Sequence, residues 1–464
     1  MLTCSKKDTT PKNVEVHDFV WKGLNAYYLW QSSISDLADS RFKNDEQRYS
    51  YLANSGTPEE LFESLLNRPT DRFSWIVDDY ITLENSFQGI GLSNGMEFEL
   101  IRNKDTPTNI FGYVRYVIPN SDAAAKGVLR GMIFAAVNDT QLTESNYRDL
   151  LFNANEYTIN LANYNAGNPI LNGNTIVLTK TQIQENPVAI TKTFEEGNHK
   201  IGYLMYNQFS SSFDGELNAA FGTLKAENVT DLIVDLRYNG GGSVKTAVYL
   251  GSMITGQFNG QLYSKQVWNE KALASFNPNV LINNFTNEIL NKDNDGNIIL
   301  QEPLNSLELQ TVYFIVSGSS ASASELVINA LSPYITVKLV GTTTVGKVQG
   351  SALLYDSDNY EKNGSNFNSN HRYAMLPIIL EIQNKNGQNK PEGYTPEVEL
   401  KEDYGNLGIL GEKSDPLLDR AITYILTGAR QRSTTSSFQL KEVTNTKLES
   451  PTRNNMYVEL KKAN

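Results

Sequence analysis

The sequence has very few residues of the kinds that bind metals or crosslink a chain. Among 464 residues there is one cysteine, Cys4, and there are three histidines, His17, His199 and His371, which lie far apart. No disulfide can therefore form within the chain, and no thiolate cluster can bind a metal. A zinc site would need all three histidines or help from carboxylates, and the H-E-x-x-H motif is absent, so we expect no metal and no other cofactor.

Basic clusters and long apolar runs are also missing. The 40 basic and 52 acidic residues give a net charge of -12, which repels a phosphate backbone, and no polybasic stretch offsets it. No apolar run reaches the ~18 residues that suggest a membrane-spanning helix. We therefore expect no nucleic-acid partner and no transmembrane helix.

The first residues, MLTCSKKDTTPKN, place Cys4 ahead of a polar stretch. Such a start resembles the mature end of a bacterial lipoprotein from which the signal region has been removed. The alternative is an ordinary free cysteine in a flexible terminus, because the apolar part of a signal peptide is missing and Thr3 is unusual there. The lipoprotein interpretation predicts a bacterial envelope location, periplasmic or anchored to the outer membrane, with membrane contact only through Cys4.

The residue pattern changes along the chain, which is too long for one ordinary core. Apolar and aromatic residues three to four apart predict a helical domain over 14–82, and short alternating strands predict a β-rich module over 83–185. Strands and helices alternate over 186–430, which predicts an α/β domain. Residues 1–13 are expected to form a flexible tether and 431–464 a polar, loosely attached tail.

Three loops of the α/β domain each follow an apolar strand. DLRYNGGGSV (Asp235–Val244) has consecutive glycines whose exposed amides suit an oxyanion, SGSSASASELVINAL (Ser317–Leu331) has five serines, and GTTTVGKV (Gly341–Val348) carries Lys347. Strand ends followed by helix starts gather at one edge of such a domain. We therefore expect these loops to converge.

Each loop also has a simpler interpretation. The glycine run can be a tight turn, and Ser322-Ala-Ser-Glu325 fits a capping box at a helix start. GTTTVGK approaches a P-loop, but Val348 stands where Ser or Thr must bind magnesium, so we expect no nucleotide site. DNDGN at Asp293 has its glycine in the wrong place for a calcium loop and predicts a hairpin turn.

Serine and lysine can together form a hydrolytic dyad, which suits a chain with almost no histidine. A lysine can act as the general base only when it is neutral, and burial achieves this by lowering its pKa. A Ser-His-Asp enzyme would have to use His371 as its candidate, and the G-x-S-x-G motif is absent. Asp235 and Arg237 flank the glycine loop, and we expect them to pair structurally.

The segments DLRYNGGG, SGSSASASE and TTVGK, in this order, resemble the C-terminal processing (tail-specific) serine peptidases. The resemblance implies a crotonase-like α/β catalytic domain and serine-lysine catalysis. In that family the nucleophile is the first serine of S-A-S-E and the lysine follows 25 positions later, which selects Ser322 and Lys347. By the same resemblance, the amides of Gly241 and Ala323 would hold the oxyanion.

The chain departs from the family pattern at the position of a third catalytic residue. Many members have glutamine four positions after the lysine, where this chain has Ser351, so the nearest glutamine, Gln349, is the candidate. Gly240 also replaces a proline that the family usually has in the glycine loop. The helical segment and the polar tail lie outside the core to which the resemblance applies.

The β-rich module contains VIPNSDAAAKGVLRGMIFAAVND, which resembles a PDZ domain. The segment Gly89, Ile90, Gly91 and Leu92 then resembles the PDZ loop whose amides bind a peptide's terminal carboxylate, beside a strand edge that pairs with the peptide. The alternative is a plain glycine turn before a strand. The resemblance implies a PDZ-like domain that controls the access of substrate tails.

These features predict an α/β serine endopeptidase with a crotonase-like catalytic domain, a PDZ-like domain and a small N-terminal helical domain. It would cleave protein or peptide substrates recognised by their C-terminal tails. The alternative is a non-catalytic peptide- or ligand-binding envelope protein on the same fold, because fold does not fix function. The sequence determines neither the substrate nor the oligomeric state.

Overall fold

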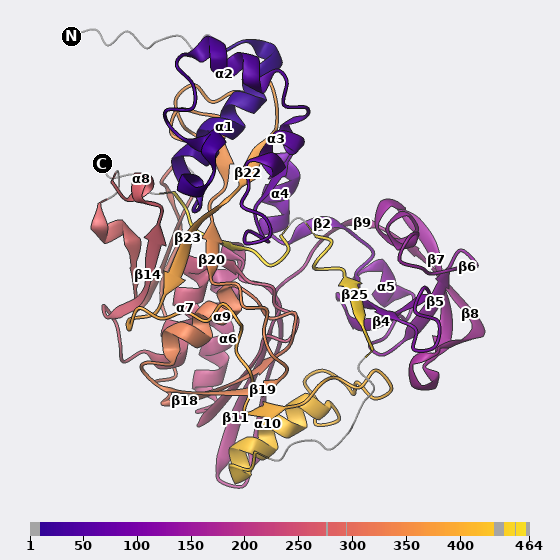
Figure 1. Ribbon diagram of the computed structural model, residues 1–464. Coiled ribbons are helices and arrows are strands. Elements are labelled where there is room, and N and C mark those ends of the chain that lie inside the picture. Colours follow the sequence, from indigo (N-terminus) through magenta and orange to yellow (C-terminus); the bar gives the residue numbers. More distant parts are fainter. Residues whose placement is uncertain (1–9, 275–276, 294, 431–439, 451, 461–464) are drawn as a thin grey trace.

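The computed structural model describes residues 10–274, 277–293, 295–430, 440–450 and 452–460. Cys4, for which the sequence suggests a lipid anchor, lies outside the described residues. The chain forms a helical region, a β-rich lobe and an α/β body (Figure 1). Within the described ranges, no helix is long and apolar enough to cross a bilayer.

The helical region begins the described chain. Its helices are α1 (Glu15–Tyr27), α2 (Asp45–Leu52), α3 (Pro58–Ser64) and α4 (Tyr80–Phe87), with short 3₁₀ turns at Lys12–Val14, Gln31–Ser33 and Ser35–Leu37. Thr57 caps α3 in a reciprocal capping box with Glu60, directly before Pro58, which suits the first helical position. Helix α4 crosses the expected boundary at residue 82.

This helical region shares its core with the α/β body. Strand β1 (Trp75–Val77) pairs with β22 (Ala374–Leu376), which in turn pairs with β21 (Leu354–Tyr355). Leu24 and Phe62 are fully buried in one apolar cluster with Met375 and Leu380 of the body. The helices are therefore fixed against the body by burial of apolar surface.

The β-rich lobe is a seven-stranded sheet in the order β25-β3-β4-β5-β7-β8, with β6 on β5. Its elements are β2 (Ile90–Ser93), β3 (Met96–Arg102), β4 (Ile110–Val117), α5 (Asp122–Ala125), β5 (Ile133–Val137), β6 (Thr140–Gln141), a π-helical turn (Arg148–Asn153), β7 (Glu156–Asn163), a 3₁₀ turn (Asn165–Gly167), β8 (Ile170–Thr179) and β9 (Thr181–Gln184). Strand β2 pairs with β9 beside the sheet. A separate apolar cluster that includes Phe98 and Phe134 fills this lobe.

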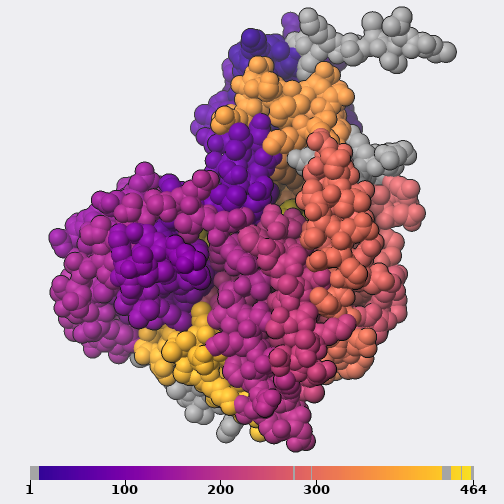
Figure 2. Space-filling view, turned by 180° about the vertical axis from the view of Figure 1, so that it is seen from behind, coloured from indigo at the N-terminus to yellow at the C-terminus, as the bar shows by residue number. Residues whose placement is uncertain are grey.

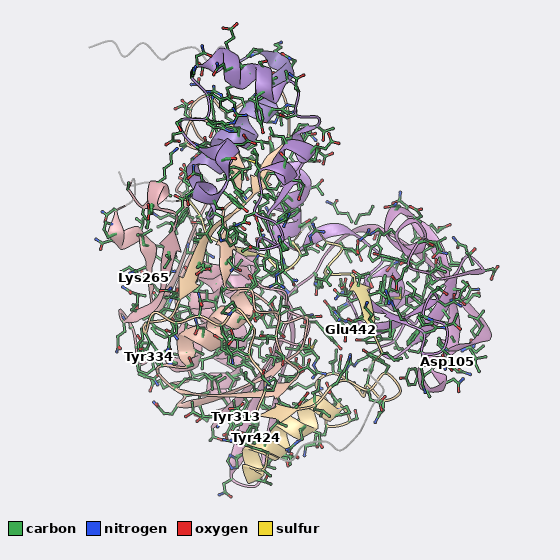
Figure 3. The ribbon with its side chains drawn as sticks, viewed as in Figure 1. Asp105, Lys265, Tyr313, Tyr334, Tyr424 and Glu442 are labelled. Atoms are coloured by element: carbon green, nitrogen blue, oxygen red, sulfur yellow. The ribbon has the colours of Figure 1, made fainter. Side chains whose placement is uncertain are left out.

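The α/β body is built on a sheet in the order β10-β11-β12-β18-β19-β24, parallel from β11 to β24. Its elements are β10 (Val188–Glu196), β11 (His199–Tyr206), a 3₁₀ turn (Ser211–Phe213), α6 (Asp214–Ala226), β12 (Asp231–Asp235), α7 (Val244–Thr255), β18 (Thr311–Val316), α9 (Ala323–Leu331), β19 (Thr336–Gly341), β24 (Val398–Glu399) and α10 (Pro416–Thr427). Alternate residues of the strands face α10 on one side and α6, α7 and α9 on the other. Tyr424 of α10 meets Tyr313 of β18 edge-on, with ring centroids 5.6 Å apart (Figure 3).

A second sheet of the body has the order β13-β26-β20-β23-β14-β15. Its strands are β13 (Gly242–Ser243), β14 (Leu262–Trp268), β15 (Ile282–Asn284), β20 (Gln349–Ser351), β23 (Ile378–Gln383) and β26 (Met456–Tyr457). Helix α8 (Glu270–Leu273), a 3₁₀ turn (Pro278–Leu281) and the hairpin of β16 (Glu288–Lys292) and β17 (Ile298–Pro303) complete the body. Asp293 lies at the end of β16, and its backbone bonds with Asn297 and Gly296 form the turn expected for DNDGN.

The expectation of a loosely attached tail is wrong for the described part of 431–464. Residues 442–445 form β25 on the edge of the β-rich lobe, and residues 456–457 form β26 inside the second sheet of the body. Figure 1 shows this yellow segment cross from the lobe to the body, and Figure 2 shows from behind the furrow between those two parts. A polar composition suggested disorder, but strand pairing satisfies the backbone of this segment without a large apolar face.

Asp235 and Arg237 pair as expected. Both side chains are fully buried, with 2.6 Å between Arg237 Nη2 and Asp235 Oδ2, and Arg237 also reaches Asp415 and Glu402. Burial opposes the ionisation of Glu402, but Arg130 and Arg237 together lower its pKa to about 2. This network fixes the backbone from which the glycine loop departs.

Since the helical region shares the core of the body, both should unfold together. Three of the four tryptophans, Trp21, Trp30 and Trp75, lie in the helical region. We expect urea unfolding followed by tryptophan fluorescence to coincide with unfolding followed by far-ultraviolet circular dichroism. We also expect Leu24→Ala to lower the free energy of unfolding by about 2–5 kcal/mol. The exposed Leu129→Ala is the control, and two separate transitions would contradict a shared core.

Candidate active site

Ser322 lies at the start of α9 in a backbone conformation that few residues adopt. Its φ is +66° and its ψ is -114°, a region that is strained for a residue with a Cβ. The residue is fully buried, and its Oγ has no hydrogen-bond partner among the described residues. A buried hydroxyl without a partner costs free energy, so such a group indicates a functional role.

The neighbouring serines have structural partners. Ser320 Oγ donates to the carbonyl of Leu236 at 2.7 Å, and Ser324 Oγ donates to the carbonyl of Asn239 at 3.0 Å. Ser317 Oγ donates to the carbonyl of Arg237, and Ser319 Oγ accepts a bond from Arg115. These bonds explain the five serines: three join this loop to the glycine loop, Ser319 joins it to Arg115 of the β-rich lobe, and the hydroxyl of Ser322 remains without a partner in the described ranges.

Glu325 joins the serine loop to the lysine loop. Its carboxylate accepts the N–H of Ser322 at 2.8 Å, of Gly346 at 2.7 Å and of Lys347 at 2.8 Å. Thr344 Oγ1 donates to the same carboxylate at 2.5 Å. Burial raises the pKa of Glu325, and these hydrogen bonds oppose that rise. The capping residue of the S-x-x-E pattern therefore also positions Lys347.

Lys347 is buried, with 1 % of its surface exposed. Burial lowers the pKa of its amine from 10.5 to about 7, although Asp71 and Glu325 favour the charged form. Its Nζ lies 4.8 Å from the ring centroid of Phe73, so residues of the helical region cover the amine. Burial therefore gives this amine the low pKa that a lysine needs in order to act as a base.

Ser322 and Lys347 line one small cavity, together with Tyr394 and Met456. No hydrogen bond joins their side chains within the described structure. Instead, Lys347 Nζ donates to the carbonyl oxygen of Asn454 at 2.6 Å. The structure thus brings the two residues to the same site without a direct bond between them.

The glycine loop lies directly against Ser322. A Cβ on Gly241 would meet Ser322 Cβ at 2.7 Å and the amide nitrogen of Ala323 at 3.0 Å, and the φ of Gly241 is +110°. Only glycine fits this position. The N–H of Gly241 donates to Asn239 Oδ1 at 2.9 Å, so it is engaged within its own loop. The structure therefore brings Gly241 and Ala323 to Ser322, with the amide of Gly241 already bonded.

Two sequence candidates do not meet the site. Gln349 is the first residue of β20, and among the described residues its side chain makes no hydrogen bond to Lys347. His371 has Asp356 as its partner, with 3.0 Å between Nε2 and Oδ2, and it does not line the cavity of Ser322. In the described ranges, no group of three or more His, Cys, Asp or Glu side chains could hold a metal ion.

The predicted carboxylate-binding loop lines a different and larger cavity. Gly89, Ile90, Gly91 and Leu92 face this cavity together with residues of the 446–452 stretch. Leu92 is 60 % exposed, and a Cβ on Gly91 would meet no atom. The expectation of a loop is wrong for most of this segment, because Ile90, Gly91 and Leu92 belong to strand β2, which pairs with β9. The segment borders an open cavity, and this cavity does not include Ser322.

Comparison with known families matches both the body and the helical region. Residues 200–374 match the model of peptidase family S41, and residues 15–75 match the model of the peptidase S41 N-terminal domain. The helical segment was expected to lie outside the core to which the resemblance applies, and the second match shows that it corresponds to a separate N-terminal domain of the family. Asp71 and Phe73, which lie beside Lys347, fall within this match.

Similar proteins are known as sequences and as solved structures. The carboxy-terminal-processing protease of Bartonella bacilliformis is 24% identical over 345 residues, which are 68% of this chain and 70% of that protein. A crystal structure from Bacteroides fragilis NCTC 9343, named as an S41 protease, covers 92% of this chain and 99% of its own, with a TM-score of 0.65 and 21% identity. The photosystem II D1 C-terminal processing protease covers 88% and 100%, with a TM-score of 0.50 and 17% identity.

The role of Glu325 can be tested by removing its charge. We expect Glu325→Gln to weaken or break at least one of the bonds to the three amides, because an amide group has one acceptor oxygen instead of two. The free energy of unfolding should fall by about 1–3 kcal/mol for each buried N–H left without an acceptor. Glu46→Gln, at an exposed position of α2, is the control, and equal stability of both variants in urea would contradict the positioning role.

Proposed function

The chain belongs to peptidase family S41, the C-terminal processing serine peptidases, and from this premise we propose a Ser322–Lys347 dyad that cleaves peptide bonds. One observation carries the proposal. A hydroxyl without a partner and a buried amine whose pKa lies near neutrality line the same cavity. This pairing supplies a nucleophile and a base that is partly neutral at physiological pH.

The first step is proton transfer from Ser322 to the neutral amine of Lys347. For this step the amine must leave the carbonyl of Asn454 and reach Ser322 Oγ. The hydroxyl oxygen then attacks the carbonyl carbon of the substrate, and a tetrahedral intermediate forms. The peptide C–N bond breaks as the proton passes from Lys347 to the leaving amine, which gives the acyl-enzyme. Lys347 then takes a proton from a water molecule that attacks the acyl carbon, and it returns this proton to Ser322 Oγ as the ester bond breaks.

The developing oxyanion would be held by the amides of Ala323 and Gly241. Ala323 is the first residue of α9, so its N–H lies at the positive end of a helix. Gly241 is in contact distance of both Ser322 and Ala323, but its N–H must exchange Asn239 Oδ1 for the oxyanion. We propose that substrate binding brings about this exchange.

Recognition of substrate tails by the β-rich lobe also belongs to the proposal. The Gly89–Leu92 segment and β3 border one cavity of the lobe, and the edge of β3 pairs with the extended strand β25. PDZ domains bind peptides at such an edge. An envelope location, with a possible lipid anchor at Cys4, and a crotonase-like core stay predictions. The alternative function is binding without cleavage, and the following experiment distinguishes the two.

The dyad is tested by removing the hydroxyl. We expect Ser322→Ala to reduce kcat/KM for a peptide with an apolar C-terminus by roughly 10³-fold or more. Ser319→Ala in the same loop is the control. The hydroxyl of Ser319 is bonded to Arg115 and is not a candidate nucleophile, so this variant should lose little activity. Equal turnover by Ser322→Ala and the wild type would refute the nucleophile, and saturable binding without turnover by the wild type would favour the carrier.

The base should appear in the pH dependence. Because Lys347 must be neutral, kcat/KM should rise about tenfold per pH unit below about 7 and level off above it. Lys347→Arg should be inactive over the whole range, since the guanidinium stays charged. Rates measured from pH 5 to 9 check this expectation. A profile without a break near 7 would contradict the assignment of Lys347 as the base.

A further inference from the structure

We propose that the segment 440–460 is an internal peptide ligand that occupies the path of a substrate, so that the described structure is a latent form. This inference rests on the proposed function, because it places the segment in the catalytic cleft of that function. The segment engages two separate places in turn. It first extends the sheet of the β-rich lobe at β3, and it then enters the second sheet of the body beside Ser322.

The first contact is a strand added to an open edge. Strand β25 (Glu442–Asn445), which begins at the Glu442 labelled in Figure 3, runs antiparallel to β3. Glu442 lies opposite Ile101, and Asn445 lies opposite Glu99. Addition of an antiparallel strand is one way in which domains bind extended peptides. The segment runs along β3 toward the predicted carboxylate-binding loop, which is the direction that a bound C-terminus would take.

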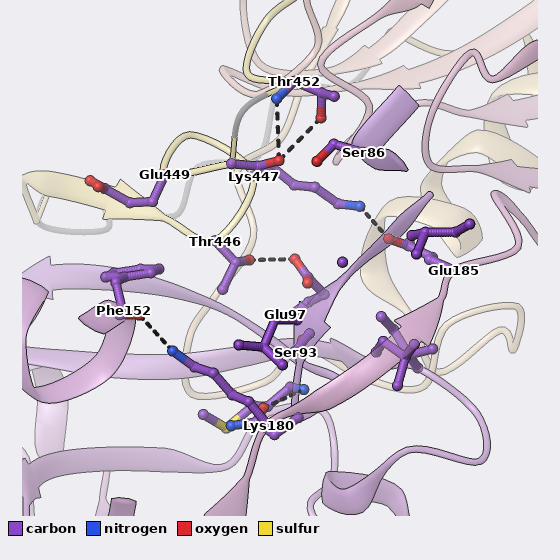
Figure 4. A pocket seen from close by; sticks show the side chains of 18 of the residues that line it. Ser86, Ser93, Glu97, Phe152, Lys180, Glu185, Thr446, Lys447, Glu449 and Thr452 are labelled. Carbon is purple, nitrogen blue, oxygen red and sulfur yellow. Dashed lines mark hydrogen bonds and ion pairs between the residues drawn. The ribbon is translucent and has the colours of Figure 1, made fainter. Parts of the chain in front are cut away.

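The segment does not end at that loop but is held beside it. Lys447 forms an ion pair with Glu185, and Thr446 Oγ1 donates to Glu97 (Figure 4). Glu185 and Glu97 outweigh burial and raise the pKa of Lys447, so the amine keeps its charge. All four residues line the cavity that the Gly89–Leu92 loop faces. The segment therefore lies across the opening that a peptide tail would use.

The second contact completes the sheet of the body. Strand β26 (Met456–Tyr457) lies between β13 and β20, with Met456 opposite Gly242 and Tyr457 opposite both Ser243 and Ser351. The N–H of Val458 donates to the carbonyl of Ser351 at 2.9 Å. The ring of Tyr457 stacks on Phe87 of α4 at 4.5 Å. Without this segment β13 and β20 would each have an open edge, which is a slot for one extended peptide.

In this slot the segment touches the catalytic groups themselves. The carbonyl of Asn454 holds the amine of Lys347 at 2.6 Å, which explains why that amine is not bonded to Ser322. The carbonyl of Asn455 lies 2.5 Å from where a Cβ of Gly241 would be, so it faces the glycine loop. Met456 is buried and forms part of the wall of the cavity of Ser322. The segment thus engages the base, faces the glycine loop and lines the cavity beside Ser322.

The occupant also indicates the substrate class. Met456 lines this cavity together with Leu326, Val348, Ile382 and Tyr394, and it is buried in the apolar cluster that contains Leu326 and Ile382. A substrate that replaces the segment would be an extended peptide that pairs with β13 and β20 and places an apolar side chain of about the length of methionine there. Such a peptide must first displace residues 452–458, so the fraction of displaced molecules limits the rate.

Full-length variants that loosen the segment test this proposal. Met456→Glu places a charge in the apolar cavity, and Lys447→Met removes the ion pair at the other end of the segment. We expect each to raise kcat/KM by about tenfold or more for a peptide with methionine-like residues, since the competent fraction rises. The exposed Ile409→Glu on the body is the control and should leave kcat/KM unchanged.

A synthetic peptide of residues 440–460 supplies an independent readout. Labelled with a fluorophore, it should bind Met456→Glu and Lys447→Met in an anisotropy titration, bind wild type far more weakly, and inhibit the loosened variants competitively. Unchanged kcat/KM in both folded variants, together with no binding of the peptide to either, would overturn the inference. Peptide binding without turnover by any variant would instead refute the proposed catalysis and leave the internal ligand standing.

Discussion

The site depends on one buried carboxylate and the backbone amides that it holds. Glu325 accepts hydrogen bonds from Ser322, Gly346 and Lys347, so two loops that are far apart in sequence have one fixed relative position. A carboxylate bonded to several N–H groups pays for its burial only when all of those bonds form. This condition couples the strained backbone at Ser322 to the placement of Lys347, and it gives the capping pattern of the sequence a second purpose.

The low pKa of Lys347 is a property of the assembled molecule. Its own loop supplies the amine, the helical region supplies the cover at Phe73 and the nearby charge of Asp71, and residues 452–458 close the remaining side. In the described form all three parts keep water from the amine, and a peptide in the slot would take the place of the third. The helical region therefore helps to lower the pKa of Lys347, and it is also the part that matches the family's N-terminal domain.

Strand pairing gives the structure a means of control. The segment 440–460 satisfies open edges in the lobe and in the body, and an incoming peptide would satisfy the same edges. When a peptide takes the place of the segment, each backbone hydrogen bond that is lost is replaced by a similar one. The difference in free energy between the segment-bound and the peptide-bound form can therefore be small. Substrates that match the cavity beside Ser322 would then be selected by how well they compete with Met456.

The sequence by itself determined the loops of the site and the candidates within them. Strand-loop-helix patterns located the three loops, the scarcity of histidine pointed to lysine as the base, and the resemblance to the family, with its separation of 25 positions, implied Ser322 and Lys347. The pattern S-x-x-E contained Glu325, although only as a helix cap. These features are local, because they depend on residue type and spacing within short stretches.

Only the tertiary structure decided what surrounds Ser322 and Lys347. No pattern in the sequence joins Asp71 and Phe73 to Lys347, or Asn454 to its amine, because these contacts depend on packing between distant segments. The tail was expected to be loose since its composition is polar, yet backbone hydrogen bonds at two sheet edges hold it. Backbone pairing depends little on side-chain type, so the composition of the tail cannot predict it. The pairing becomes visible only when the edges of β3, β13 and β20 are in place.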